Sequence, residues 1–216
     1  MKVTDRYRGL KKEGKSDAEI LKIFKKPTDM KVFSWGGEID TTMTPWDSIR
    51  YHKSFLRAGF MAMNPHNGQV KAYVGGIDFK YFQFDMVNIG LRQVGSTMKP
   101  FLYSLCMQEG MTPCDQMTYE DRTYITEAGT PWNPRGVRSN MIGQTVSVKW
   151  GLQNSDNVVT AYLMSRTTPY ALVRMLHTFG ITGKIDPVIA LALGTPDVSV
   201  GEMAGAYTAF ANSGIR

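Results

Sequence analysis

Cysteine and histidine are scarce in this chain, which has two Cys and three His among its 216 residues. Cys106 and Cys114 cannot build a disulfide framework, and Cys106 falls on the apolar stripe of a predicted helix, so we expect a buried free thiol there. The histidines, His52, His66 and His177, are far apart and have no cysteine or acidic partner at the spacing of metal ligands. We therefore predict no metal and no cofactor.

Long apolar runs are also missing. No run approaches the roughly 18 residues that a transmembrane helix requires, and no charged-then-apolar signal opens the chain. If the protein is exported, we expect the exporting segment to lie outside this sequence. The hydrophobic content of 43% and its regular patterning exclude disorder and predict one domain with a core and a short extension.

The net charge of +6 is unevenly distributed. Residues 1–31 carry ten Lys or Arg and five Asp or Glu, whereas the remaining residues carry fifteen and fourteen. A basic surface can face anionic lipid or a phosphate-bearing substrate, but a solvated basic extension is the favoured interpretation. The aromatic run at 79–84 has only Lys80 as an interleaved basic residue, so we expect no nucleic-acid partner. We assign residues 1–50 to a basic N-terminal extension or inter-domain linker, and residues 51–216 to the N-terminal and helical part of the main domain.

A serine and a lysine stand three residues apart where the chain predicts a helix. The stretch from Thr97 to Glu109 has helix formers and an apolar stripe, and Gly110 follows as a stop signal. Because side chains three apart share a helix face, the hydroxyl of Ser96 and the amine of Lys99 are within reach of each other. Ser96 is then a candidate nucleophile and Lys99 its base, provided that apolar neighbours lower the pKa of the amine. By itself the pairing is weak, since about one such spacing is expected by chance in a chain of this length.

A second polar motif lies 59 residues after the first serine. A helical pattern over 145–153 runs into Asn154-Ser155-Asp156-Asn157, and an apolar helix follows over 158–164. Ser155 and Asn157 therefore lie where one predicted helix turns into the next. The separation is long enough for the chain to fold back over the first motif.

The remaining elements are predicted from capping and alternation signals. Ser16 with Glu19 and Ser199 with Glu202 form capping boxes that open helices, and Thr168-Pro169 opens another. Alternating residues predict a hairpin that is buried on at least one face. The further expectations are a strand and turn over 31–44, a helix start at 45–49, hairpin strands over 55–63 and 69–74, a long surface loop over 114–146 and an apolar segment over 189–194.

Together, the two motifs match the S-x-x-K and S-D-N signature of penicillin-binding proteins and serine β-lactamases. Flanking stretches sharpen the match: 92–101 reads RQVGSTMKPF, Val74-Gly75-Gly76 follows a predicted strand, and 202–214 reads EMAGAYTAFANSG. From about Tyr51 onward the chain resembles the transpeptidase domain of class A penicillin-binding proteins. This resemblance implies an α+β fold of the penicillin-binding protein and β-lactamase type, with an antiparallel sheet packed against helices.

The resemblance also implies a role for each motif residue. Ser96 attacks the D-Ala-D-Ala carbonyl of a peptidoglycan stem peptide and becomes acylated, while Lys99 accepts its proton. Ser155 relays a proton to the leaving amine, and Asn157 hydrogen-bonds the substrate amide and helps to orient Lys99. The amine of a second stem peptide then resolves the acyl-enzyme into a cross-link, and β-lactams acylate the same serine. The backbone N–H of Ser96 is expected to form half of the oxyanion hole.

Departures from the family pattern set further expectations. No Lys-Thr-Gly or Lys-Ser-Gly motif occurs before Arg216, so we expect that motif and the C-terminal strands of the sheet to be missing from this chain, and turnover by the fragment to be poor. The resemblance also implies a glycosyltransferase domain and a membrane anchor in the parent chain, which would place it at the extracytoplasmic, periplasmic face of the bacterial inner membrane.

Within the same chemistry, a β-lactamase or a carboxypeptidase would transfer the acyl group to water instead of to an amine. A class A β-lactamase needs a Glu-x-x-Leu-Asn pattern after the second motif, and an α/β hydrolase needs Gly-x-Ser-x-Gly; the chain has neither. A non-catalytic sensor of stem peptide or β-lactam, or a docking domain, remains the main alternative, although the intact motif residues argue against a degenerate site.

Overall fold

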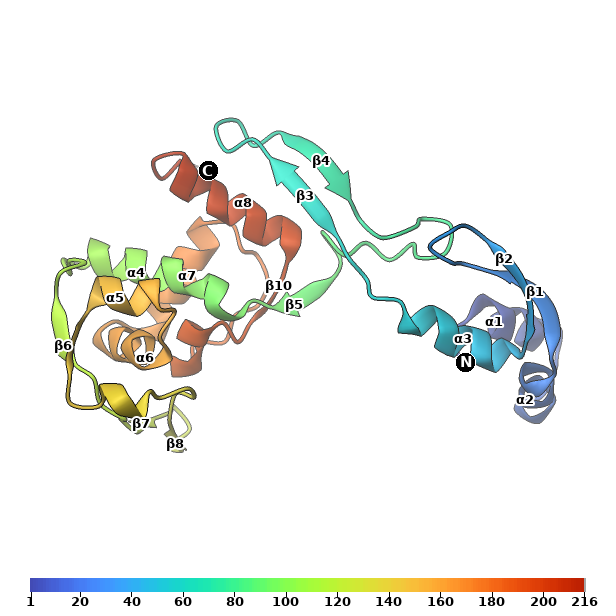
Figure 1. Cartoon of the computed structure of the whole chain (residues 1–216), viewed down its shortest axis with the longest axis horizontal. Coiled ribbons are helices and arrows are strands. Elements are labelled where there is room, and N and C mark those ends of the chain that lie inside the picture. The colour runs from blue at the N-terminus through green and yellow to red at the C-terminus, as the bar shows by residue number, and fades with distance from the viewer. Residues whose placement is uncertain (216) are drawn as a thin grey trace. The chain divides into compact units, whose positions relative to one another are not determined.

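The computed structural model describes residues 1–215 and divides into two compact units. The first comprises Met1–Ala58 with Asp78–Gln83, and the second comprises Gly59–Ile77 with the chain from Phe84 onward. The elements of both are drawn in Figure 1. The boundary that we placed at residue 50 stays a prediction. Within residues 1–215, no helix combines the length and the apolar character that crossing a bilayer requires.

Capping residues begin the helices of the first unit. The capping box of Ser16 and Glu19 forms as predicted and begins α2, and Thr44 accepts a hydrogen bond from the backbone N–H of Asp47 to begin α3. Helices α1 and α2 bury Tyr7, Ile20 and Phe24 in a small cluster. The unit contains α1 (Asp5–Lys12), α2 (Asp17–Lys25), the antiparallel strands β1 (Thr28–Val32) and β2 (Ile39–Met43), and α3 (Pro45–Ser54).

Helix α4 (Lys99–Gln108) lies at the centre of the second unit. Its apolar residues are largely buried, and it packs against α5 (Val148–Gln153), α6 (Asn157–Arg166) and α7 (Pro169–Thr178), as Figure 1 shows. The capping box of Ser199 and Glu202 begins α8 (Val200–Ala211) as predicted. Three short 3₁₀ turns complete the helical elements: η1 (Gly95–Met98), η2 (Ser139–Met141) and η3 (Ile189–Leu193).

The strands of the second unit form four separate antiparallel pairs among the described residues. The pairing of β5 with β10 matters most for the site, because it brings a segment near the end of the chain alongside the residues that precede Ser96. The pairs are β3 (Phe60–Met63) with β4 (Val70–Val74), β5 (Leu91–Gln93) with β10 (Asp197–Ser199), β6 (Gln116–Thr118) with β9 (Thr145–Ser147), and β7 (Tyr124–Ile125) with β8 (Pro131–Trp132).

Three local predictions were wrong. The hairpin forms, but every residue of β4 is exposed, because β3 and β4 pair with no third strand in the described chain and α8 packs beside β3. The predicted loop over 114–146 contains the strands β6, β7 and β8, a 3₁₀ turn and the first two residues of β9. Residues 145–147 are β9 rather than the start of a helix, since they pair with β6. The pairing of β6 with β9 joins distant segments, and local patterns do not report it.

Candidate active site

Ser96 lies in the 3₁₀ turn η1, immediately before α4. The turn is held at both ends: the backbone N–H of Gly95 donates to the carbonyl of Gly194 at 3.0 Å, and the Tyr207 hydroxyl donates to the carbonyl of Thr97 at 2.7 Å. The side chain of Ser96 is exposed. Its backbone N–H is in the first turn of η1, where such groups have no acceptor within the helix. The fold thus presents a serine hydroxyl and a backbone donor on a fixed turn.

Gly194 makes this anchoring possible because its backbone lies directly against that of Gly95. A Cβ atom at position 194 would stand 2.0 Å from the Gly95 carbonyl oxygen, and the φ angle of Gly194 is +79°. Both the close approach and the left-handed conformation require glycine. The motifs do not predict Gly194 as a site residue. Its signals in the sequence are its position at the end of the apolar segment 189–194 and the Leu193-Gly194 pair, which is one of the stretches that resemble the family.

Lys99 is the first residue of α4 and only 1% of its surface is exposed. Its amine donates three hydrogen bonds to the second motif: to the Ser155 carbonyl oxygen at 2.5 Å, to Ser155 Oγ at 3.1 Å and to Asn157 Oδ1 at 2.8 Å. Ser155 and Asn157 are 56 and 58 residues from Lys99 along the chain, and the two motifs meet at the amine.

The surroundings of Lys99 act on its pKa in opposite directions. Burial lowers the pKa of the amine from its ordinary value, and the negative charge of Asp156 opposes that shift; burial is the larger effect, so the pKa is lowered. An ammonium has three protons to donate, and the three acceptors match that form. A neutral amine would use two of them and keep a lone pair. The site therefore holds the amine firmly while easing its deprotonation.

Ser155 occupies a left-handed turn that closes α5. Its φ angle is +49°, its N–H donates to the Leu152 carbonyl at 3.0 Å, and the N–H of Asp156 donates to the Gly151 carbonyl at 2.8 Å. These are the two bonds of a Schellman motif, in which the residue at the left-handed position is most often glycine. A serine in this position carries backbone strain, and such strain clusters at functional sites.

Asn157 is held at both ends of its carboxamide. Its Oδ1 accepts from Lys99, and its Nδ2 donates to the backbone carbonyl of Arg135 at 2.9 Å. As the first residue of α6, it follows directly on the helix cap formed by Asp156. Asn157 therefore contacts the Lys99 amine directly, and its expected role in orienting that amine stays a prediction.

The structure brings three of the four predicted site residues into direct contact: Lys99, Ser155 and Asn157. Within residues 1–215, no hydrogen bond joins the Ser96 hydroxyl to the Lys99 amine, although the backbone N–H of Lys99 donates to the carbonyl of Ser96. The protons of the amine are already directed to the second motif. The catalytic roles of all four residues stay predictions.

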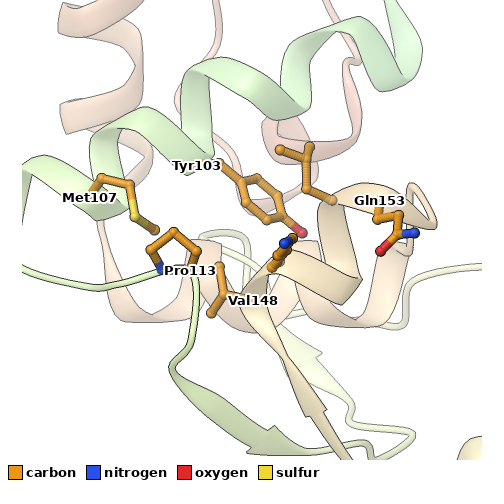
Figure 2. A pocket seen from close by; sticks show the side chains of 7 residues that line it. Tyr103, Met107, Pro113, Val148 and Gln153 are labelled. Carbon is orange, nitrogen blue, oxygen red and sulfur yellow. The ribbon is translucent and has the colours of Figure 1, made fainter.

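A cavity of about 520 Å³ opens elsewhere in the second unit, between α4 and α5. Figure 2 shows Tyr103 and Met107 of α4 on one side, with Pro113, Val148 and Gln153 across from them. None of the four predicted site residues lines this cavity, so hydrogen bonds and not a cavity define the candidate site. Among residues 1–215, no group of three or more His, Cys, Asp or Glu side chains is arranged to hold a metal ion.

Comparison with protein families places the chain. Residues 58–216 match the penicillin binding protein transpeptidase domain, and residues 1–56 match the penicillin-binding protein middle domain. Because the first match spans more than half of the sequence, the chain belongs to the penicillin-binding protein transpeptidase family, as its motifs predicted.

Individual relatives agree with this assignment. The chain is 32% identical over 161 residues to penicillin-binding protein 1A of Rickettsia conorii, a match that covers 74% of the chain and 20% of the relative. It is 35% identical over 164 residues to penicillin-binding protein 2D of Bacillus subtilis, which covers 74% of the chain and 23% of the relative. The chain therefore spans about a fifth of the length of the curated relatives that it matches.

Solved structures confirm the predicted fold class. The crystal structure of penicillin-binding protein 1A from Haemophilus influenzae matches with a TM-score of 0.65 and 26% identity, over 71% of this chain and 23% of that one. A peptidoglycan glycosyltransferase from Burkholderia ambifaria matches with a TM-score of 0.58 and 20% identity, over 78% of this chain and 57% of that one. The second likeness concerns the fold alone.

Proposed function

We propose that this chain carries the acylation machinery of a serine-type peptidoglycan D,D-transpeptidase. One observation carries the proposal: Ser155 and Asn157 of a distant motif hold the buried amine of Lys99, the first residue of α4, and the turn just before α4 presents Ser96. Together with the family membership, this arrangement supports acyl transfer through Ser96.

In the first step, Ser96 attacks the D-Ala-D-Ala carbonyl of a stem peptide. A serine hydroxyl needs a neighbouring base, and the lowered pKa of Lys99 makes its neutral form accessible for that role. The hydroxyl proton passes to Lys99, a C–O bond forms, and the backbone N–H of Ser96 stabilises the negative charge that develops on the carbonyl oxygen. The bond to the terminal D-Ala then breaks, and Ser155, in contact with Lys99, conducts the proton to the departing amine.

In the second step, the amine of another stem peptide attacks the acyl-enzyme and forms the cross-link. β-Lactams acylate the same serine and act as inhibitors. We further propose that the chain works within a longer protein with a glycosyltransferase domain and a membrane anchor, at the extracytoplasmic face of the inner membrane. The relatives named penicillin-binding protein 1A, of which this chain spans about a fifth, support that context.

Labelling with fluorescent penicillin tests the nucleophile in the longest natural protein that contains this chain. We expect Ser96→Ala to abolish labelling and Ser165→Ala, which removes an exposed hydroxyl on α6 of the same unit, to leave it unchanged. Equal labelling of the wild type and Ser96→Ala would discard Ser96 as the nucleophile.

A measurement of turnover distinguishes the transpeptidase from the alternative function, a non-catalytic sensor or docking domain. A transpeptidase releases D-alanine from a stem pentapeptide and joins two stems, whereas a sensor binds without release. Penicillin labelling without release of D-alanine or formation of a cross-link in the longest natural protein would favour the sensor.

A further inference from the structure

Asp156, the middle residue of the second motif, is buried. Only 3% of its surface is exposed, although the residues on either side of it, Ser155 and Asn157, both contact the Lys99 amine. A buried carboxylate is unfavourable unless it is well provided with donors. Asp156 therefore needs hydrogen-bond donors or a positive charge within the protein.

Four groups from three segments surround this carboxylate. Its Oδ1 accepts from the backbone N–H groups of Val158 and Val159 at 2.9 and 3.1 Å, which caps α6. Its Oδ2 accepts from the Tyr119 hydroxyl at 3.2 Å and lies 3.6 Å from Nε of Arg138. Serine or asparagine would cap α6 comparably. Tyr119 and Arg138, which come from distant positions, supply more than a helix cap needs.

Tyr119 joins the two distant segments into one support. It is fully buried, and its hydroxyl accepts from the backbone N–H of Arg138 at 3.1 Å while donating to Asp156. The guanidinium of Arg138 also lies over the ring of Trp150 in α5, 5.5 Å from its centroid. Asp156 is thus fixed from the loop side as well as from α6, and both acceptor residues of Lys99 are covalently attached to it.

We propose that Asp156 is a positioning residue of the candidate site. Tyr119 and Arg138 hold its carboxylate, and this keeps Ser155 and Asn157 within hydrogen-bond distance of the Lys99 amine. The proposal rests on the function proposed above. The charge of Asp156 also acts on Lys99: it favours the ammonium form and raises the pKa of the amine against the effect of burial. The other titratable groups that interact with Asp156 are Tyr119 and Arg138 from the loop and Tyr103 from α4.

Two substitutions distinguish the hydrogen bonds that Asp156 accepts from the charge that it carries. Asp156→Ala removes the cap and both long-range contacts, so we expect acylation by fluorescent penicillin to slow about tenfold or more per folded molecule, as the loss of hydrogen bonds to a charged group implies. Asp156→Asn keeps an acceptor for the α6 amides and restores most of the rate. Because it removes a negative charge near Lys99, it lowers the pKa of the amine further, and the acid limb of the acylation profile moves to lower pH.

The matched control is Asp186→Asn, which removes an exposed carboxylate in the same unit and should leave both rate and pH profile unchanged. Folded protein is quantified by circular dichroism in the longest natural protein. If Asp156→Ala does not fold, Tyr119→Phe removes one donor to Asp156 and keeps the ring, and it should slow acylation about threefold or more.

Two results would each overturn the proposal. The first is acylation of folded Asp156→Ala, or of Tyr119→Phe in its place, at a rate within twofold of the wild type. The second is an acid limb of Asp156→Asn that coincides with that of the wild type. Failure of the proposed function looks different, because Ser96→Ala would then still be labelled. A purely structural role for Asp156 would lower thermal stability without moving the acid limb.

Discussion

The left-handed backbone of Ser155 allows its strain and its chemistry to be tested separately. An L-residue in the left-handed region costs about 1–2 kcal/mol, and glycine avoids this cost but loses about 0.5–1 kcal/mol through the extra freedom of the unfolded chain. Ser155→Gly and Ser155→Ala both remove the hydroxyl that contacts Lys99 at 3.1 Å. They differ in how well they tolerate a φ angle of +49° and in the freedom of the unfolded chain. We therefore expect the glycine variant to be more stable than the alanine variant by about 1 kcal/mol.

Thermal unfolding followed by circular dichroism measures this difference. For a domain the size of the second unit, about 1 kcal/mol corresponds to about 2–4 °C in Tm. Penicillin acylation supplies the second measurement: both variants should lose activity to the same degree, within about twofold, because both lack the same oxygen atom. A glycine variant that melts at or below the temperature of the alanine variant would refute the strain argument. A large difference in acylation between them would refute the assignment of the chemistry to the hydroxyl.

Three further predictions follow from the same unit. Gly194→Ala should abolish most penicillin labelling, because its Cβ would meet the backbone of Gly95, whereas Gly183→Ala, which meets no atom within 4 Å, should label normally. Lys99→Met should slow acylation by about 100-fold or more, the usual contribution of a general base, and a wild-type rate for this variant would remove Lys99 from that role. In the wild type, acylation should rise with pH through a Lys99 pKa below the ordinary lysine value, since the neutral amine is the active form. Tyr207→Phe removes one neutral hydrogen bond to the turn η1, worth about 1 kcal/mol, and should slow acylation about fivefold, measured against wild type at equal folded concentration.

Local signals predicted the helix starts well. The capping boxes at Ser16 and Ser199, and the proline that follows Thr168, all begin helices where the sequence indicated. These devices act over three or four residues, so the sequence contains all the information they need. The burial of Cys106 was predicted from the apolar stripe for the same reason and is confirmed.

Pairings between distant segments were not predictable in this way. Residues 145–147 looked helical but form β9, because the ladder with β6 outweighs their local pattern. The hairpin of β3 and β4 has strand-like alternation yet stays exposed, since burial depends on what packs over it and not on its own residues.

The sequence by itself determined the family, the position of the candidate nucleophile at a helix start and the residues of both motifs. Only the tertiary structure decided that the Lys99 amine faces Ser155 and Asn157, that Gly194 supports the turn of Ser96, and that Asp156 is buried. The physical reason is the same in each instance. Motif letters specify which donors and acceptors exist, but hydrogen bonding and desolvation depend on which atoms meet, and residues more than fifty positions apart meet only when the whole unit packs.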